Sequence, residues 1–331
     1  MNPESTTPDL LAIDCAAETE RIAASLRAYL QKNRRRGLVL GLSGGIDSTV
    51  TAALAVRAVG AERVFGLHMP DSQSEAATLV LSRTVAEWLK LSHALEEITP
   101  LLDAAGFFRR YTAAARQVIP EFTDAWKSKV VIHATGGAHT FSYFTLVGQS
   151  PEGRTETARL PLQAYLEIVA ATNFKQRTRK MLEYYHADRL NYAVAGTPNR
   201  LEYDQGFFVK NGDGSADIKP IAHLYKTQVY RLAEYLGVPP EIRHRPPTTD
   251  TYSLPQGQDE FYFALPYQQM DLCLYGKNHG LAPETVAAAA RLDRSTVERV
   301  WADIDRKRAT THYLHLKPAL VENIPEVSSL A

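Results

Sequence analysis

Short apolar runs alternate with amphipathic stretches along the first hundred residues of this 331-residue chain. The run 38–42 is long enough for one buried strand, and further strands are predicted over 63–70 and 93–98. Apolar residues at helical spacing predict helices over 8–33 and 76–91, and an alanine-rich stretch predicts another from Thr49. This order predicts an α/β fold, a doubly wound parallel (Rossmann-like) sheet with helices on both faces.

The rest of the pattern is consistent with one domain, 1–331, that carries an inserted segment. Residues 101–160 are the least regular part, but their aromatic residues indicate packing, and 141–147 with 154–160 predict a β-hairpin. Helices are predicted over 161–185, 224–236 and 281–306, and a strand over 190–195. Ligands of a doubly wound sheet bind at the carboxyl ends of its strands.

Composition and charge exclude several classes of protein. The hydrophobic fraction of 45% and the charged fraction of 22% are ordinary for a soluble protein. Because 37 Lys and Arg balance 37 Asp and Glu, no overall field attracts nucleic acid. No apolar run predicts a membrane span, and the N-terminal residues predict no export signal. Cys15 and Cys273 match no metal or redox spacing, which predicts two reduced thiols in a cytoplasmic protein.

The segment Ser43–Ser48 joins the strand 38–42 to the alanine-rich helix. A strand, a glycine turn and a helix in this order form a phosphate cradle, because backbone N–H groups and the positive helix end converge there. Gly44 and Gly45 allow an anion to approach the main chain, and Asp47 can hold a magnesium ion. The alternative is a turn of small residues kept for packing, which the complete Ser-Gly-Gly-x-Asp-Ser string disfavours.

Three further segments carry candidate charges. Arg177 and Arg179 are two positions apart on a predicted helix, so only one of them faces a given ligand. The glycine-rich stretch 206–220 holds acids between lysines and equally suits a surface turn. Lys226 lies near a predicted helix start, where a cation opposes the helix dipole, so an anion-binding role is favoured.

The loop Ser43–Ser48 resembles that of the ATP pyrophosphatases, which split ATP between its α- and β-phosphates. Other segments resemble the NAD synthetase branch of that group over about 36–100 and 161–260. They are Asn173–Arg179, Gly196–Glu202, Gly206–Pro220, Leu224–Gln228 and Pro246–Thr248.

The resemblance implies a homodimeric ligase that adenylates the carboxylate of nicotinic acid adenine dinucleotide (deamido-NAD) with ATP and Mg²⁺. Ammonia then gives NAD and AMP, and no side-chain nucleophile is needed. Asp47 and Glu202 match the magnesium ligands. The positions that match ATP-binding residues are Gly41, Leu42, Ser43, Gly44, Gly45, Ile46, Asp47, Ser48, Thr197, Lys226 and Thr248. The positions that match the dinucleotide site are Arg177, Lys210, Asp217 and His312.

Three departures from the family lie on the substrate side. Residues 101–160 are longer than usual, 261–266 replace a short acidic-Leu-Gly turn, and His312-Tyr313 stands where the family has His-Lys. These departures leave open an adenylating ligase for a different carboxylic acid, and a non-catalytic nucleotide-binding protein is a third reading. No amidase half is recognised, so ammonia is expected either free or from a separate glutaminase.

Overall fold

The computed structural model describes residues 9–134, 142–246, 251–257, 262–263 and 265–328. Its centre is a four-stranded sheet in the order β3-β2-β1-β7, with every neighbouring pair parallel. The strands are β1 (Leu38–Gly41), β2 (Val64–His68), β3 (Ser92–Leu95) and β7 (Ala193–Val194). The predicted doubly wound parallel sheet is therefore confirmed. Because β2 and β7 flank β1 on opposite sides, the strand order reverses at β1, where such sheets bind ligands.

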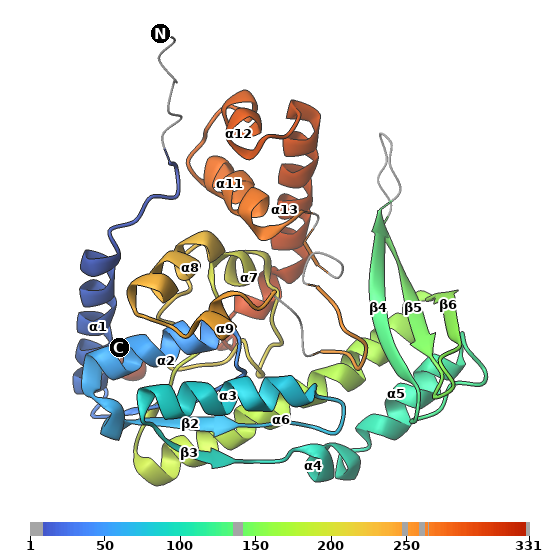
Figure 1. Ribbon diagram of the computed structural model, residues 1–331, viewed down its shortest axis with the longest axis horizontal. Helices are drawn as coiled ribbons and strands as arrows, with labels where there is room; N and C mark the ends of the chain where they lie inside the picture. Colours follow the sequence, from blue (N-terminus) through green and yellow to red (C-terminus); the bar gives the residue numbers. More distant parts are fainter. Residues whose placement is uncertain (1–8, 135–141, 247–250, 258–261, 264, 329–331) are drawn as a thin grey trace.

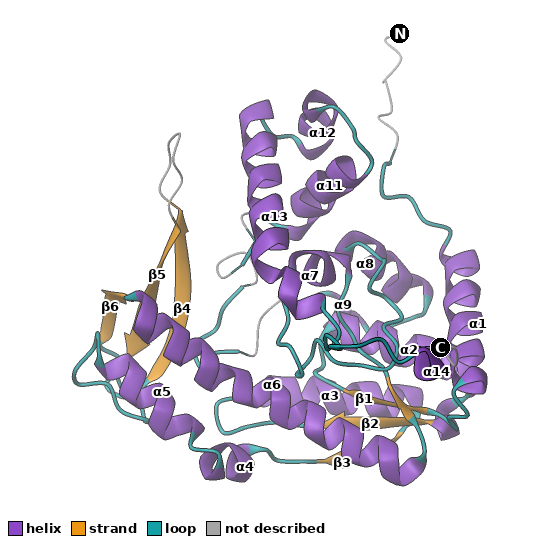
Figure 2. Cartoon of the chain, turned by 180° about the vertical axis from the view of Figure 1, so that it is seen from behind, coloured by secondary structure: helices purple, strands orange, loops and turns teal. Residues whose placement is uncertain are grey.

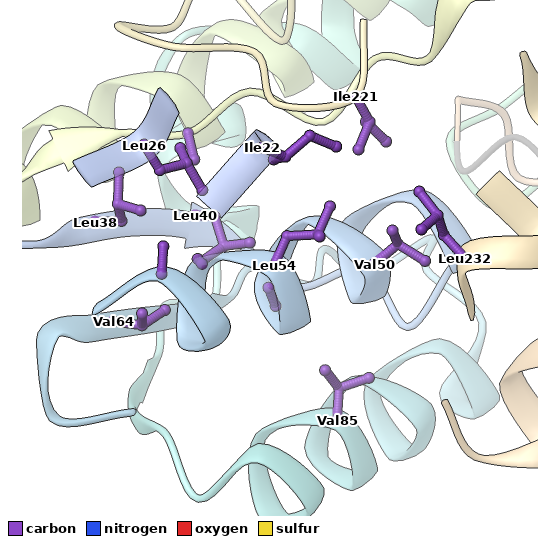
Figure 3. Packing of buried hydrophobic residues seen from close by; sticks show 14 of the residues in the cluster. Ile22, Leu26, Leu38, Leu40, Val50, Leu54, Val64, Val85, Ile221 and Leu232 are labelled. Carbon is purple, nitrogen blue, oxygen red and sulfur yellow. The ribbon is translucent and has the colours of Figure 1, made fainter. Parts of the chain in front are cut away.

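Helices cover both faces of this sheet (Figure 1). Successive residues of a strand point to opposite faces, so Leu38 and Leu40 pack into one buried cluster and Val39 into another. Figure 3 shows the first cluster. Its helices are α1 (Cys15–Lys32), α2 (Ile46–Val59), α3 (Ala76–Leu89) and α8 (Lys226–Tyr235). The second cluster is built on α4 (Thr99–Ala104), α5 (Phe107–Arg116) and α6 (Leu162–Leu190).

Several element boundaries differ from those predicted, and two of them lie next to β1 and β7. The helix expected from Thr49 begins at Ile46, which places Asp47 and Ser48 in its first turn. The helix expected over 161–185 continues to Leu190, so β7 keeps only two residues of the strand predicted over 190–195. In both places the local pattern suits either state, and packing against the sheet decides the boundary.

The segment 101–160 contributes a second sheet, antiparallel and in the order β4-β5-β6. Its strands are β4 (Lys127–Ala134), β5 (Ser142–Gln149) and β6 (Thr155–Arg159). β5 and β6 form a hairpin where one was predicted, with Leu146 opposite Ala158; Phe141 lies outside the described residues. The sequence did not predict β4. Figures 1 and 2 show this sheet beside one end of α6, away from the parallel sheet.

The C-terminal part is helical and forms a third buried cluster. The helices that contribute to it are α7 (Arg200–Gln205), α11 (Tyr267–Asn278), α12 (Pro283–Ala290) and α13 (Arg294–His315). The other short elements are α9 (Pro240–Arg243), whose Ile242 joins the first cluster, α14 (Pro325–Ser328) and a 3-10 turn at Ala61–Arg63. Asp293 caps α13 by accepting a hydrogen bond from the backbone N–H of Thr296. Among the described residues, every helix is too short or too polar to cross a membrane.

Candidate active site

The loop after β1 has a backbone that only glycine satisfies at one position. Gly44 has φ +69°, and a Cβ there would lie 2.8 Å from Leu81 Cβ and 2.9 Å from the backbone nitrogen of Ser82. The close approach of α3 therefore fixes Gly44 by both conformation and space. The glycine predicted to admit an anion also lets two helices meet.

Hydroxyl groups hold the rest of this loop around the first turn of α2. The backbone N–H of Gly45 donates to Ser43 Oγ at 3.2 Å, and the two hydroxyls of Ser43 and Ser48 lie 3.0 Å apart. Gly45 is the N-cap residue of α2 and has no side chain to cap the helix. A helix start without a side-chain cap leaves backbone N–H groups for an outside anion such as phosphate.

Two carboxylates and a lysine meet beside this loop, at the ends of β1 and β7. Asn199 connects the carboxylates, because its Nδ2 donates to Asp47 Oδ1 at 3.2 Å and its backbone N–H donates to Glu202 Oε2 at 3.1 Å. Asn199 and Glu202 also form a reciprocal capping box at the start of α7. The side chain of Lys226 forms an ion pair with Asp47. Asp47 and Glu202 therefore lie on the same side of the molecule.

Lys226 is a buried cation held by these acids. Burial alone would lower its pKa, but the carboxylates of Asp47 and Glu202 outweigh that effect and raise the pKa above the ordinary value. Asp271 positions the helix that carries Lys226, since it accepts hydrogen bonds from the backbone N–H groups of Lys226 and Thr227 at 3.2 and 2.6 Å. The lysine is thus charged at neutral pH and fixed at the loop.

A cavity of about 820 Å³ opens over this group. Of the residues expected to bind ATP, those that line it are Gly41, Leu42, Ser43, Gly45, Ile46, Asp47, Ser48, Thr197 and Lys226, and Glu202 lines it too. Gly44 is not among the lining residues; it packs against Leu81 and Ser82 of α3. Thr248 lies outside the described residues.

The four residues expected at the dinucleotide site lie away from this cavity. Arg177 is exposed on α6 and donates from Nε to the carbonyl of Lys210 at 3.3 Å, while Lys210 Nζ donates to the carbonyl of Tyr313 at 2.7 Å. Asp217 accepts from the backbone N–H of Val194 at 2.7 Å, and His312 is exposed on α13. They form a separate surface next to α6, so they do not share a pocket with the ATP group.

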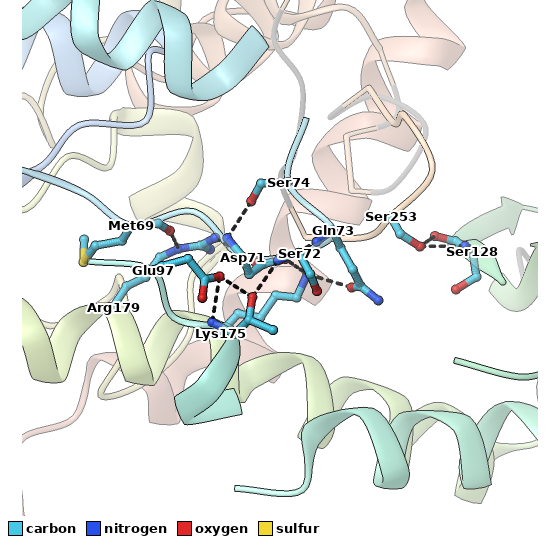
Figure 4. A network of polar contacts seen from close by, with 11 residues as sticks. Met69, Asp71, Ser72, Gln73, Ser74, Glu97, Ser128, Lys175, Arg179 and Ser253 are labelled. Carbon is cyan, nitrogen blue, oxygen red and sulfur yellow. Dashed lines mark hydrogen bonds and ion pairs between the residues drawn. The ribbon is translucent and has the colours of Figure 1, made fainter. Parts of the chain in front are cut away.

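Other charged residues, which the sequence did not single out for the cavity, do line it. Figure 4 shows the buried carboxylate of Asp71 between Lys175, at 3.3 Å, and Arg179, at 3.0 Å. Arg179 also donates to the carbonyl of Met69 at 3.0 Å. Of the two arginines, Arg179 lines the cavity and pairs with Asp71, whereas Arg177, which the resemblance selected for the dinucleotide, does not line it. Helical spacing from Lys175 could have indicated this choice.

A second charged group in the cavity comes from α6 and the glycine-rich stretch. Lys180 forms a buried ion pair with Glu183 at 2.5 Å, and Asp213 accepts from the backbone N–H of Val209 at 2.7 Å. Burial raises the pKa of Asp213 above its ordinary value. Of the two acids in 206–220, the structure thus places Asp213 in the cavity and Asp217 outside it.

His68, at the end of β2, supports the loop from below. The hydroxyl of Ser82 donates to the carbonyl of Leu42 at 2.7 Å, so its contact with His68 Nδ1 requires that this nitrogen carry the proton. Nε2 then accepts from His93 Nδ1, at 3.1 Å. Burial, with the neighbouring His93, lowers the pKa of His68 to about 4, so the ring is neutral at pH 7.

A sheet that reverses order at β1, a glycine loop at a helix start, and two acids with a lysine at the same strand ends define an α/β nucleotide-binding protein of the ATP-pyrophosphatase type. The sequence profile of the NAD synthase family matches residues 18–125 and 153–313, and the chain belongs to this family.

Individual relatives agree with the family. The chain is 59% identical to the NH(3)-dependent NAD(+) synthetase of Rhizobium meliloti, over 96% of both chains. It is 57% identical to the protein of that name from Mesorhizobium japonicum, over 96% of this chain and all of the relative. Among solved structures, the NMN synthetase of Francisella tularensis aligns with a TM-score of 0.65 and 24% identity, over 95% of this chain and all of that one, which shows the fold.

Proposed function

We propose that this chain is an ammonia-dependent ligase that converts deamido-NAD into NAD with ATP, releasing AMP and pyrophosphate. The near-complete relatives at 57–59% identity carry the name of that activity. The structural observation that carries the proposal is the meeting of the glycine loop, Asp47, Glu202 and Lys226 in one cavity. Phosphate oxygens of ATP would accept from the loop N–H groups and from Lys226.

Magnesium fits the two carboxylates. Mg²⁺ in phosphoryl-transfer sites is held by one or two carboxylates together with substrate phosphates, without a full protein cage. Asn199 holds the carboxylates of Asp47 and Glu202 beside the glycine loop, so these are the ligands we propose. When bound there, Mg²⁺ would neutralise charge on the phosphates and on the departing pyrophosphate.

The chemistry of the step is positioning and charge neutralisation. The carboxylate of deamido-NAD attacks the α-phosphorus of ATP, the bond to the β-phosphate oxygen breaks, and ammonia then displaces AMP from the acyl-adenylate. Lys226 is paired with Asp47, one of the two proposed metal ligands, and this ion pair keeps it charged until phosphate oxygens replace that partner.

Neither cysteine suits glutamine hydrolysis. Burial raises the pKa of Cys273 to about 11 and raises that of Cys15 above its ordinary value, so neither thiol is a thiolate at neutral pH. We therefore propose that ammonia arrives free or from a separate glutaminase. Both thiols are unpaired, which supports a cytoplasmic location.

We also propose that the chain forms a homodimer through the exposed face of α6. Leu166, Met181 and Tyr185 are 50–59% exposed and share one face of this helix with Arg177. Apolar side chains exposed at intervals along one helix face would be covered if a second copy packed against it. This arrangement gives a role to Arg177 and to the nearby Lys210, Asp217 and His312. The dinucleotide would bind where the two copies meet, with its carboxylate reaching into the cavity.

The test is turnover of purified protein with ATP, Mg²⁺, ammonium and deamido-NAD. We expect NAD and AMP in equal amounts. Formation of ADP, or no turnover, would reject the proposal. If ATP–pyrophosphate exchange occurs only with some other carboxylic acid, the enzyme is an adenylating ligase for that acid. ATP binding without AMP formation under any condition would leave a non-catalytic protein.

A further inference from the structure

The segment that the family profile does not match, 126–152, contains all of β4 and all of β5. β4 pairs with β5 along one edge only, because the sheet order is β4-β5-β6. An edge strand has unpaired N–H and C=O groups that another segment can use. In this protein, residues 251–257 lie along that edge.

Backbone and side-chain groups of the two segments are joined at alternate positions of β4. The N–H of Ser128 donates to Ser253 Oγ at 2.8 Å, and the N–H of Leu254 donates to the carbonyl of Ser128 at 3.1 Å. Gln256, which is 2% exposed, donates from Nε2 to the carbonyl of Val130 at 2.6 Å. Residues 128 and 130 point their backbone groups to the same edge, so these contacts form one continuous seam, part of which Figure 4 shows.

The held segment forms part of the cavity wall. Thr251 and Tyr252 line the cavity, and Tyr252 belongs to the same buried cluster as Trp126, Val130 and Leu146 of the inserted segment. From the insertion itself, Ile132 and Phe144 reach the same cavity. The segment follows Arg245 and Pro246, which line the cavity beside the phosphate loop; Arg245 donates to Thr78 Oγ1 of α3 at 2.9 Å.

We propose that the edge of β4 positions residues 251–256 as a preformed wall of the ATP site, with Ser253 and Gln256 as positioning residues. The inference rests on the proposed function only in taking ATP as the ligand. The segment lies in the connection between α9 and α11 and has no regular helix or strand of its own. Without the seam the segment would have to be ordered each time ATP binds. The apparent affinity is then the intrinsic affinity multiplied by the fraction of molecules in which the segment is already ordered.

The test compares Ser253→Ala, Gln256→Ala and the double variant with the wild type. In the double variant the seam is lost, and we take residues 251–256 to be correctly placed in about a tenth to a third of molecules. The KM for ATP should then rise by roughly 3- to 10-fold. The kcat at saturating ATP stays within about twofold, because the bound state is the same. Ser253→Thr keeps the hydroxyl and should restore the wild-type KM. The matched control is Thr157→Ala, an exposed position on β6 of the same sheet.

Two further measurements separate positioning from general destabilisation. Hydrogen exchange should show loss of protection at Leu254 in the double variant with β1 and β2 unchanged. Calorimetry with a non-hydrolysable ATP analogue should show the same loss of affinity as the KM. An unchanged KM and affinity in the double variant would overturn the inference, as would a fall in kcat alone. If the wild type binds the analogue but makes no NAD, the proposed function is rejected. The affinity of the double variant for the analogue then decides this inference on its own.

Discussion

Glu202 combines a structural contact with a proposed metal contact, and one substitution separates them. Its carboxylate accepts from the backbone N–H of Asn199 within the capping box of α7. Glutamine also serves in a capping box, since its amide oxygen accepts the same bond. Glu202→Gln therefore keeps the cap and removes the charge that would hold Mg²⁺.

We expect the free energy of unfolding of Glu202→Gln to stay within about 1 kcal/mol of that of the wild type. Its kcat/KM should fall by about 100-fold or more, as for loss of a charge-stabilising group. The half-saturating Mg²⁺ concentration should rise. Thermal unfolding and steady-state kinetics over a Mg²⁺ series measure both effects. Unchanged Mg²⁺ dependence would remove Glu202 from the metal site.

His68 makes stability depend on pH. The pKa of His68 is about 4 in the folded protein, because of burial and His93, and about 6.5 in the unfolded chain. Between these values only the unfolded chain takes up the proton, so the free energy of unfolding falls as pH drops from 6.5 toward 4 and is fully recovered above 6.5. The loss from this group is at most about 3 kcal/mol.

His68→Gln, which cannot be protonated, should show a smaller loss of unfolding free energy between pH 7 and pH 5 than the wild type. Urea denaturation at both pH values measures it. His244→Gln, at an exposed position, is the control and should keep the wild-type dependence. Equal pH dependence of His68→Gln and the wild type would contradict the buried neutral ring.

At the residue scale, the sequence identified the charged group that lines the cavity beside the glycine loop. Asp47, Glu202 and Lys226 have side-chain chemistry that suits metal and phosphate wherever they lie, so a motif was enough to select them. The resemblance selected Arg177 and Asp217 for the dinucleotide, whereas Arg179 and Asp213 are the members of these two pairs that line the cavity. Each pair has the same chemistry, and only the packing of α6 and of the glycine-rich stretch determines which member faces the cavity.

At the scale of elements, the strand–loop–helix unit depends on the contact between α2 and α3 at Gly44. Gly44→Ala introduces a Cβ within 3 Å of backbone and side-chain atoms of α3, at a positive φ. Gly237 has φ +73° and no atom within 4 Å of an added Cβ, so Gly237→Ala carries the conformational strain without the clash.

We expect Gly237→Ala to lower the free energy of unfolding by about 1 kcal/mol and Gly44→Ala to lower it by about 2–4 kcal/mol. Gly44→Ala should also weaken ATP-analogue binding at least 10-fold, because α2 must shift to relieve the clash. Chemical denaturation and calorimetry report the two effects. Equal free energies of unfolding for the two variants would show that α3 can move away from the added Cβ without loss of stability.

Element existence followed from the sequence more reliably than element ends did. The apolar run of β1 and the helical spacing of α1 and α3 specify their type locally. The starting residue of α2 and the shortness of β7 depend on tertiary contacts, and β4 was missed. β4 pairs with the next strand, β5, but its other edge is held by residues 253–256, and Ser253 is 125 positions from its partner Ser128.

At the scale of the whole molecule, the exposed face of α6 predicts association. Met181→Glu puts a charge into a surface of exposed apolar side chains, and burial of an unpaired charge in an interface is strongly unfavourable. We expect sedimentation velocity to give a dimer for the wild type and a monomer for Met181→Glu at micromolar concentration. The KM for deamido-NAD should rise with dissociation if the dinucleotide binds between copies.

Val80→Glu is the control for this substitution. Val80 is 63% exposed on α3, away from α6, and its charge should leave the assembly unchanged. A wild type that is monomeric at all concentrations, or a Met181→Glu variant that stays dimeric, would exclude α6 as the interface.

The sequence by itself determined the parallel α/β class of the fold, the glycine loop after β1 and the residue types that suit metal and phosphate. These depend on local spacing and on chemistry, which the order of residues contains. The tertiary structure alone decided which charges share the cavity and that the inserted sheet reaches it. Asp47 and Lys226 are 179 positions apart and meet only because β7 pairs with β1 on the side away from β2. Pairing of that kind is fixed by burial of the whole sheet between its helices, which no single segment specifies.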